Sequence, residues 1–209
     1  MKSKLQQTLE KNSKVITAEL MPPRGGDPIR SLKIAQLLKN KVHAVNVTDG
    51  SRAIMRMCSL AMSKLLLESG IEPIMQISCR DRNKIAIQSD ILGANALGIN
   101  NILCITGDSV KAGDQQETKA VHEFEAVRLL KQIQSFNQGI DPTFEQLPDK
   151  STKIFSGAAV DPSCRNQRSL KIRTIKKKEA GANFLQTQIV MDRNCLANFC
   201  NEISNPIEI

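Results

Sequence analysis

Two acidic residues stand where an enzyme could use a carboxyl group. Glu19 lies inside the apolar segment VITAELMPP, and Asp108 ends the apolar run ILCITGD. A carboxyl group in apolar surroundings holds its proton more tightly and can act as a general acid, whereas one turned outward past the strand end has no such role. Gly107 lets the backbone approach a ligand closely, although an Asp at this position is also common in ordinary turns. The two acids together favour a catalytic site more than either does alone.

Two basic segments offer sites for an anion. CRDRNK (79–84) could bind phosphate through its two arginines, or could cap the following helix through Asp81 or Asn83, which the local sequence favours. IKKKEAGAN (175–183) carries three lysines, which suit a solvated helix face and the negative end of the helix dipole. One of these lysines could still turn toward an anionic cofactor.

The composition narrows the classes of partner. The net charge of +8 suits either an anionic partner or simple solubility. Six Phe with no Tyr or Trp argue against nucleic-acid binding by base stacking. The six cysteines follow no CxxC spacing, and the two histidines have no triad or metal pattern, so we expect free thiols and no metal. Without an apolar leader or a run of about 18 apolar residues, the sequence predicts a cytoplasmic protein without a membrane partner.

These side chains are carried by alternating strand-like and helix-like segments. The predicted strands are 15–21, 44–49, 72–79, 101–108, 153–160 and 183–191, and the predicted helices are 28–40, 55–70, 83–98, 123–136, 168–181 and 195–204. Such alternation predicts an α/β fold with a parallel sheet, either doubly wound or closed as a (β/α)8 TIM barrel. The turn after the first strand, MPPRGGDP, does not suit a dinucleotide-binding helix start. The long stretch 109–151 is typical of a lid, a binding loop or disorder.

Polar residues recur at the ends of successive predicted strands, which favours the barrel because its active sites lie on that rim. They are Glu19, Thr48, Asp49, Gln76, Ser78, Asp108, Asp161 and Gln188. A complete barrel has eight βα units in about 250 residues, and only about six fit in this chain. We therefore expect residues 1–209 to form a single, incomplete TIM-barrel domain, truncated at its C-terminus. Its two open sheet edges predict poor solubility or homo-oligomerisation.

Six segments, in order, resemble the flavin-dependent methylenetetrahydrofolate reductase family over about residues 14–192. AELMPPRG resembles the family's E-x-x-P-P segment, NVTDGS its V-T-x-G turn and PIMQISCRDRN its third strand. ITGD matches its G-D strand end, GAAVDP its G-x-x-x-x-P strand, and KKKEAGANFLQTQ its K-x-x-A-G-A-x-x-x-x-T-Q segment. Six segments in the same order are far more specific than any one of them.

The resemblance implies a (β/α)8 barrel that binds FAD, uses NAD(P)H and reduces the folate substrate 5,10-methylenetetrahydrofolate to 5-methyltetrahydrofolate. In that case Glu19 is the general acid that protonates N10, and Asp108 supplies negative charge beside flavin and pterin. The implied cofactor-binding residues are Thr48, Asp49, Ser51, Gln76, Thr106, Gly107, Asp108, Lys177 and Ala182. The implied substrate-binding residues are Glu19, Asp108 and Gln188.

The chain departs from the family pattern at three of these positions or their neighbours. Gln76 stands where many members have His, Thr106 where some have Arg, and Asp161 where a Tyr precedes the proline. A donor other than NADH is therefore conceivable. The alternative hypothesis is an inactive barrel remnant that binds flavin, folate or a protein partner without turnover. The intact pair of Glu19 and Asp108 favours the enzyme.

Overall fold

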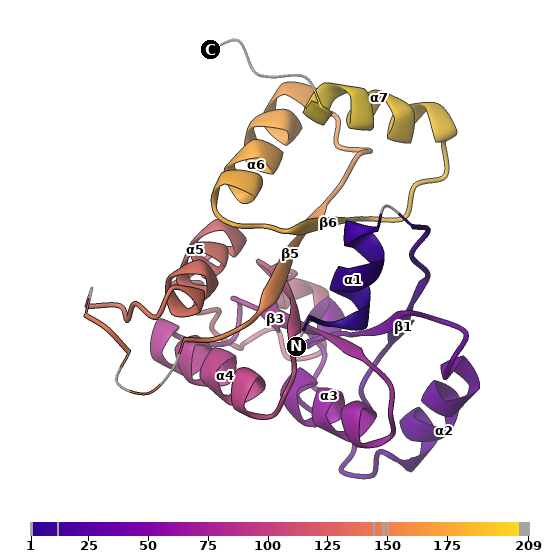
Figure 1. Cartoon of the computed structure of the whole chain (residues 1–209), viewed down its shortest axis with the longest axis vertical. Helices are drawn as coiled ribbons and strands as arrows, with labels where there is room; N and C mark the ends of the chain where they lie inside the picture. Colours follow the sequence, from indigo (N-terminus) through magenta and orange to yellow (C-terminus); the bar gives the residue numbers. More distant parts are fainter. Residues whose placement is uncertain (1, 12, 144, 148, 150, 205–209) are drawn as a thin grey trace.

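Six parallel strands form one sheet, and their order in the sheet is their order along the chain (Figure 1). The computed structural model describes residues 2–11, 13–143, 145–147, 149 and 151–204. The strands are β1 (Thr17–Leu20), β2 (Ala44–Val47), β3 (Pro73–Ser78), β4 (Asn101–Ile105), β5 (Phe155–Val160) and β6 (Phe184–Thr187). Each connection between consecutive strands is therefore a crossover, and the sheet curls into a half-barrel.

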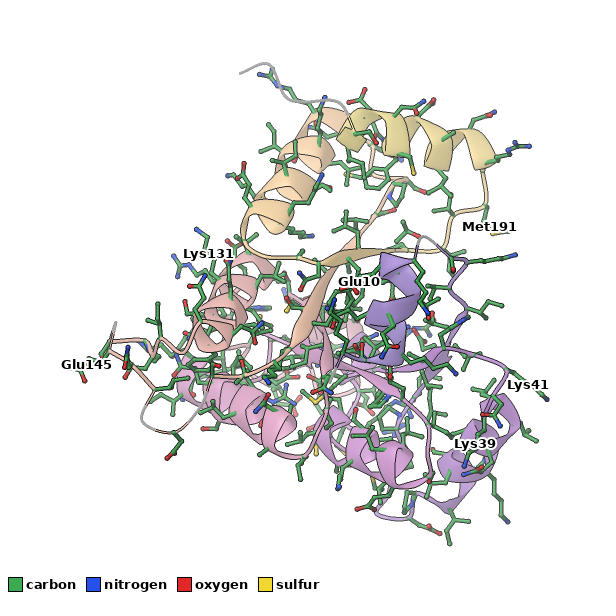
Figure 2. All side chains as sticks on the ribbon, in the orientation of Figure 1. Glu10, Lys39, Lys41, Lys131, Glu145 and Met191 are labelled. Carbon is green, nitrogen blue, oxygen red and sulfur yellow. The ribbon has the colours of Figure 1, made fainter. Side chains whose placement is uncertain are left out.

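Helices follow the strands and cover the outer face of the sheet. They are α2 (Ile29–Leu38), α3 (Ser59–Glu68), α4 (Lys84–Ala96), α5 (Ala126–Asn137), α6 (Gln167–Glu179) and α7 (Arg193–Ser204), with short 3-10 turns η1 (Ser51–Ala53) and η2 (Val110–Ala112). The basic side chains of Lys39, Lys41 and Lys131 project from the outer surface (Figure 2). No helix among the described residues is both long enough and apolar enough to cross a membrane.

The main hydrophobic core lies between the sheet and the helices α4 and α5. Strand residues Met75, Ile77 and Ile102 are buried there against Ile91 and Leu129 from the two helices. All six residues of β3 are buried, as expected for a central strand of a parallel sheet that is covered on both faces. The centre of the sheet is therefore the best-supported platform in the molecule.

The helix α1 (Lys4–Glu10), which we did not predict, lies at the end of the half-barrel where the strands begin. Its Leu5 is buried against residues of three strands, Ala44, Ile74 and Leu103. The carboxylate of Glu72 accepts hydrogen bonds from the backbone N–H groups of Lys4 (2.6 Å) and Leu5 (2.8 Å), which fixes the helix start. This helix therefore closes one end of the half-barrel and leaves the opposite end for a ligand.

The structure confirms the α/β class and six βα units, but eight units are not present among the described residues. β1 and β6 are the outer strands of the sheet, so its two edges are open as predicted. The predicted strand 183–191 is shorter, because β6 ends at Thr187 and the following Ile189 and Met191 are exposed. The long stretch 109–151 contains η2 and α5.

Candidate functional site

A cavity of about 580 Å³ opens at the carboxyl ends of the strands. Ten of the eleven predicted site residues line it: Glu19, Thr48, Asp49, Ser51, Gln76, Thr106, Gly107, Asp108, Lys177 and Gln188. The eleventh, Ala182, packs against the main hydrophobic core instead. Residues separated by up to 169 positions in sequence thus share one cavity because parallel strands bring their carboxyl ends to a common rim.

Glu19 reaches this cavity from the edge strand β1, next to Asn46 of β2 in the sheet register. Its side chain is exposed, so the apolar surroundings that the sequence suggested are not present around it. Asn46 is buried, and its Oδ1 has no hydrogen-bond partner among the described residues. The acid therefore lies in the cavity beside a buried amide that is not fully hydrogen-bonded.

Two buried polar side chains form the inner wall next to Glu19. Thr48 directly follows β2 and is 3% exposed, and its Oγ1 has no hydrogen-bond partner within the described chain. Gln76 of β3 is 7% exposed and lines the same cavity. Because an unpaired buried hydroxyl is costly, the position of Thr48 suits a ligand that supplies the missing hydrogen bond.

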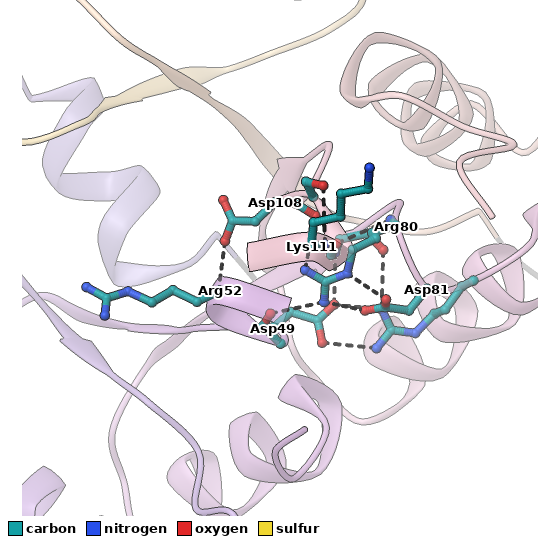
Figure 3. Close-up of polar contacts among 10 residues, drawn as sticks. Asp49, Arg52, Arg80, Asp81, Asp108 and Lys111 are labelled. Carbon is teal, nitrogen blue, oxygen red and sulfur yellow. Dashed lines mark hydrogen bonds and ion pairs between the residues drawn. The ribbon is translucent and has the colours of Figure 1, made fainter. Parts of the chain in front are cut away.

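Asp49 is held by the protein itself. Its Oδ2 accepts hydrogen bonds from the backbone N–H of Ser78 (2.8 Å) and from Arg82 (2.6 Å), and its Oδ1 accepts a second bond from Arg82 (3.0 Å). Arg82 also pairs with Asp90 at 3.0 Å, and hydrogen bonding to Asp49 raises the pKa of this guanidinium. Asp49 therefore ties the end of β2 to the end of β3 (Figure 3).

The side chain of Arg80 is also held by hydrogen bonds to protein groups, and it is only 3% exposed. It forms a two-bond pair with Asp81 (2.6 and 2.7 Å) and donates to the backbone oxygen of Gly50 (3.0 Å) (Figure 3). Hydrogen bonding of the guanidinium to the Asp81 carboxylate raises the pKa of Arg80. Asn83 caps α4, with its Oδ1 accepting from the N–H of Ala86 at 2.9 Å. The helix-cap interpretation of this segment is therefore confirmed for Asn83, and both arginines bind protein carboxylates.

Asp108 is positioned by the backbone on both sides of it. Gly107 has a positive φ of 96°, and a side chain there would collide with the hydroxyl group of Ser78. The exposed Asp108 carboxylate accepts a hydrogen bond from the N–H of Arg52 at 2.8 Å (Figure 3). Arg52 itself has a left-handed φ of 57°. The carboxylate is thus fixed at the rim by a loop geometry that only glycine accepts easily.

Lys177 of α6 supplies a positive charge to the lining of the cavity. It extends from α6, and its Nζ donates to the backbone oxygen of Ala159 at 2.7 Å. Burial lowers its pKa, and the nearby charge of Arg173 acts in the same direction. Of the three lysines in the 175–183 segment, Lys177 is the one that lines the cavity.

A second cavity of about 280 Å³ continues from the first. The two share Ala159, Lys177 and Gln188, and the second adds Arg173 and Thr174. Together they form a longer hollow in which Glu19 and Asp108 line the first cavity, and Arg173 and Asp161 line the second.

The predicted site did not include several residues that line the cavity. Among these, Gln186 and Arg80 have polar side chains that can form hydrogen bonds to a ligand. Gln186 could have been found, because it lies two residues before Gln188 and alternate residues of a strand share a face. The sequence suggested Arg80 only as a phosphate ligand, together with Arg82. No group of three potential metal ligands occurs in the described part of the chain.

In enzymes of the βα-barrel class the active site lies at the carboxyl ends of the strands, which is where this half-barrel has its polar cavity. The family model described as methylenetetrahydrofolate reductase matches residues 4–208. The chain therefore belongs to the methylenetetrahydrofolate reductase family, as the sequence motifs predicted.

Two solved structures share the fold at low sequence identity. One is an uncharacterized protein from Clostridium thermocellum that binds two copies of 5-methyl-5,6,7,8-tetrahydrofolic acid, with 14% identity and a TM-score of 0.62 over 95% of this chain. The other is 2,3-dimethylmalate lyase, a PEP mutase/isocitrate lyase superfamily member, also with 14% identity and a TM-score of 0.62, over 98% of this chain. The chain spans 63% and 68% of these proteins, respectively. No curated protein sequence matches it significantly.

Proposed function

We propose that this chain forms the folate-reducing site of a flavin-dependent methylenetetrahydrofolate reductase. The reaction is the reduction of 5,10-methylenetetrahydrofolate to 5-methyltetrahydrofolate with NAD(P)H as the electron donor. The observation that carries the proposal is the convergence of Glu19, Asp108 and Gln188 on one cavity, in a chain that belongs to this family. The Clostridium thermocellum protein that shares the fold binds the product of this reaction, which supports a folate ligand here.

The cavity residues suit FAD by two tests. The unpaired Oγ1 of Thr48 offers a hydrogen bond to a heterocyclic edge, and it is buried where a bound ring would complete its bonding. Lys177 and Arg173 outnumber the single carboxylate of Asp161 in the adjoining cavity, and the resulting positive charge suits the phosphates of a dinucleotide. FAD, when bound, supplies hydride transfer between NAD(P)H and the folate. Asp49 would act through the backbone by holding the loop that contains Ser51, because Arg82 and Ser78 occupy its carboxylate.

Glu19 and Asp108 would then have different roles, Glu19 as the general acid and Asp108 as an electrostatic stabiliser. Glu19 gives a proton to N10 of the folate, which opens the five-membered ring to a cationic iminium that accepts hydride. The carboxylate of Asp108 favours that cation electrostatically. Gln188 and Gln186 offer amide groups for hydrogen bonds to the pterin.

A Glu19→Gln variant tests the acid. We expect it to keep FAD binding and FAD reduction by NAD(P)H, and to lose folate reduction by about 10²-fold or more, the usual contribution of a general acid. An Asp114→Asn variant, which changes an exposed carboxylate paired with Arg24, is the matched control and should retain the parent rate. Folate turnover at the parent rate in Glu19→Gln would show that this residue is not the acid.

The exposure of Glu19 favours a second candidate, a remnant that binds flavin or folate without turnover, because a general acid works best where water is excluded. Equilibrium titration with FAD and 5-methyltetrahydrofolate, alongside a turnover assay, separates the two. Binding without turnover would support the hypothesis of an inactive remnant. Sedimentation of the same sample tests whether the open edges of β1 and β6 pair in a homo-oligomer.

A further inference from the structure

Cys164 lies between β5 and α6 and lines the second cavity. It is partly exposed, in contrast to the buried thiols of Cys79 and Cys104. Nothing in the proposed reaction uses this thiol.

Its surroundings are mainly basic, with one carboxylate in the same cavity, that of Asp161, which accepts a hydrogen bond from the N–H of Ser163 at 3.0 Å. The segment 165–178, which contains most of α6, carries seven basic residues and no acidic one: Arg165, Arg168, Lys171, Arg173, Lys176, Lys177 and Lys178. The guanidinium Nη2 of Arg173 donates to the sulfur of Cys164 at 3.3 Å. Among the described cysteines, this is the one sulfur that accepts a hydrogen bond from a charged group. Reactive cysteines typically occupy such partly exposed, electropositive surroundings.

A second polar group in this cavity is available for a ligand. Thr174 is 0% exposed, it lines the cavity together with Cys164, and its Oγ1 has no hydrogen-bond partner within the described chain. A hydroxyl group donates readily to a carboxylate, and a neighbouring guanidinium strengthens the binding of the same anion. Cys164, Arg173 and Thr174 thus combine a thiol with two anion-binding groups in one hollow.

We propose that Cys164 is a thiol-modification site for an anionic low-molecular-weight disulfide of the oxidised glutathione type. The sulfur of Cys164 attacks one sulfur of the reagent, the reagent's S–S bond breaks, and a mixed disulfide forms. The other half of the reagent leaves as a thiolate and takes up the proton that Cys164 gives up, so no further oxidant is needed. Arg173 and Thr174 hold a carboxylate of the attached half.

The modification regulates the site, a consequence that rests on the proposed function. The second cavity shares Ala159, Lys177 and Gln188 with the main cavity, so an adduct on Cys164 fills the space proposed for the cofactor phosphates. Cofactor and adduct therefore exclude each other. By linkage, bound FAD must lower the equilibrium extent of mixed-disulfide formation at Cys164 by the same factor by which the adduct weakens FAD binding.

The first experiment measures the rate of modification at each cysteine by peptide mass mapping of the folded, cofactor-free chain. Oxidised glutathione is compared with the cationic disulfide cystamine, and the exposed Cys200 is the internal control. We expect oxidised glutathione to be favoured over cystamine more strongly at Cys164 than at Cys200. Arg173→Gln should lower the glutathione rate at Cys164 about fivefold, as expected for the loss of one screened charge, while Arg173→Lys restores most of it. Equal selectivity at Cys164 and Cys200 would overturn the proposal.

The second experiment repeats the reaction with saturating FAD. Protection of Cys164 but not of Cys200 is the expected result, together with at least a tenfold weaker FAD affinity for the modified chain. Cys164→Ser should keep its FAD affinity during the same treatment, which separates this adduct from those on other cysteines. FAD binding without protection would refute the regulatory role. A parent chain that binds no FAD would instead contradict the proposed function and leave the modification result standing.

Discussion

Replacement of Asp49 should destabilise the fold strongly. Its carboxylate accepts three hydrogen bonds, one from Ser78 at the end of β3 and two from Arg82 in the segment that follows. Asp49→Ala leaves the N–H of the fully buried Ser78 without a partner, which costs about 1–3 kcal/mol. Arg82 loses one of its two carboxylates and keeps Asp90, so its loss is smaller than the 3–5 kcal/mol typical of a broken buried pair. We expect a total decrease of about 2–4 kcal/mol in the free energy of unfolding, and about half of that for Asp49→Asn.

Urea unfolding with a constant m-value measures this difference. The control is Asp114→Ala, which breaks the exposed pair with Arg24 and should cost less than about 1 kcal/mol. A loss below 1 kcal/mol for Asp49→Ala would refute the reasoning. If Asp49→Asn kept its stability but lost FAD binding, the carboxylate would contact the cofactor directly, as the family motif implies.

Three further outcomes are expected. Gly107→Ala should cost about 1–2 kcal/mol more in urea unfolding than Gly98→Ala, because both glycines have positive φ but only the first also places a new methyl group against a neighbouring side chain; equal losses would contradict the collision. Burial raises the pKa of Asp90. This group therefore stabilises the fold below its unfolded pKa and loses that contribution as the pH rises through the folded pKa. The stability of Asp90→Asn relative to the parent should consequently increase as the pH rises above about 4, the usual pKa of Asp; a flat difference would argue against the shift. Burial also raises the pKa of Cys79 to about 12 and that of Cys104 well above its usual value, so both should resist iodoacetamide in native protein and react after urea unfolding, as followed by mass mapping.

The sheet and most of the cavity could be predicted because they depend on local patterns. Continuous apolar runs identify buried parallel strands, and the polar residue after each run marks the rim, as for Thr48 and Asp108. Asn83 was predictable as a helix cap from its place just before α4. These features need no knowledge of which segments meet in space.

The remaining features depend on contacts between distant segments. The pairing of Asp49 with Arg82 spans 33 positions and requires the ends of β2 and β3 to lie side by side. The helix α1 is only seven residues long, and it is held by Glu72 and by the barrel end that receives Leu5. The exposure of Glu19 follows from its place on an edge strand, whereas the local sequence around it suggests burial.

The two sides of the cavity therefore differ in rigidity. Thr48, Gln76 and Arg80 are each less than 10% exposed. The segments that carry them are joined by the ion pair of Asp49 with Arg82 and by the hydrogen bond from Arg80 to the backbone oxygen of Gly50. Glu19 lies on the edge strand β1, Gln188 directly follows the edge strand β6, and both side chains are exposed. Because local unfolding begins where contacts are fewest, the edge that carries the proposed acid should open before the wall proposed for the flavin. Low urea concentrations should consequently reduce folate turnover before they release FAD, and loss of both at the same concentration would show that the site unfolds as one unit.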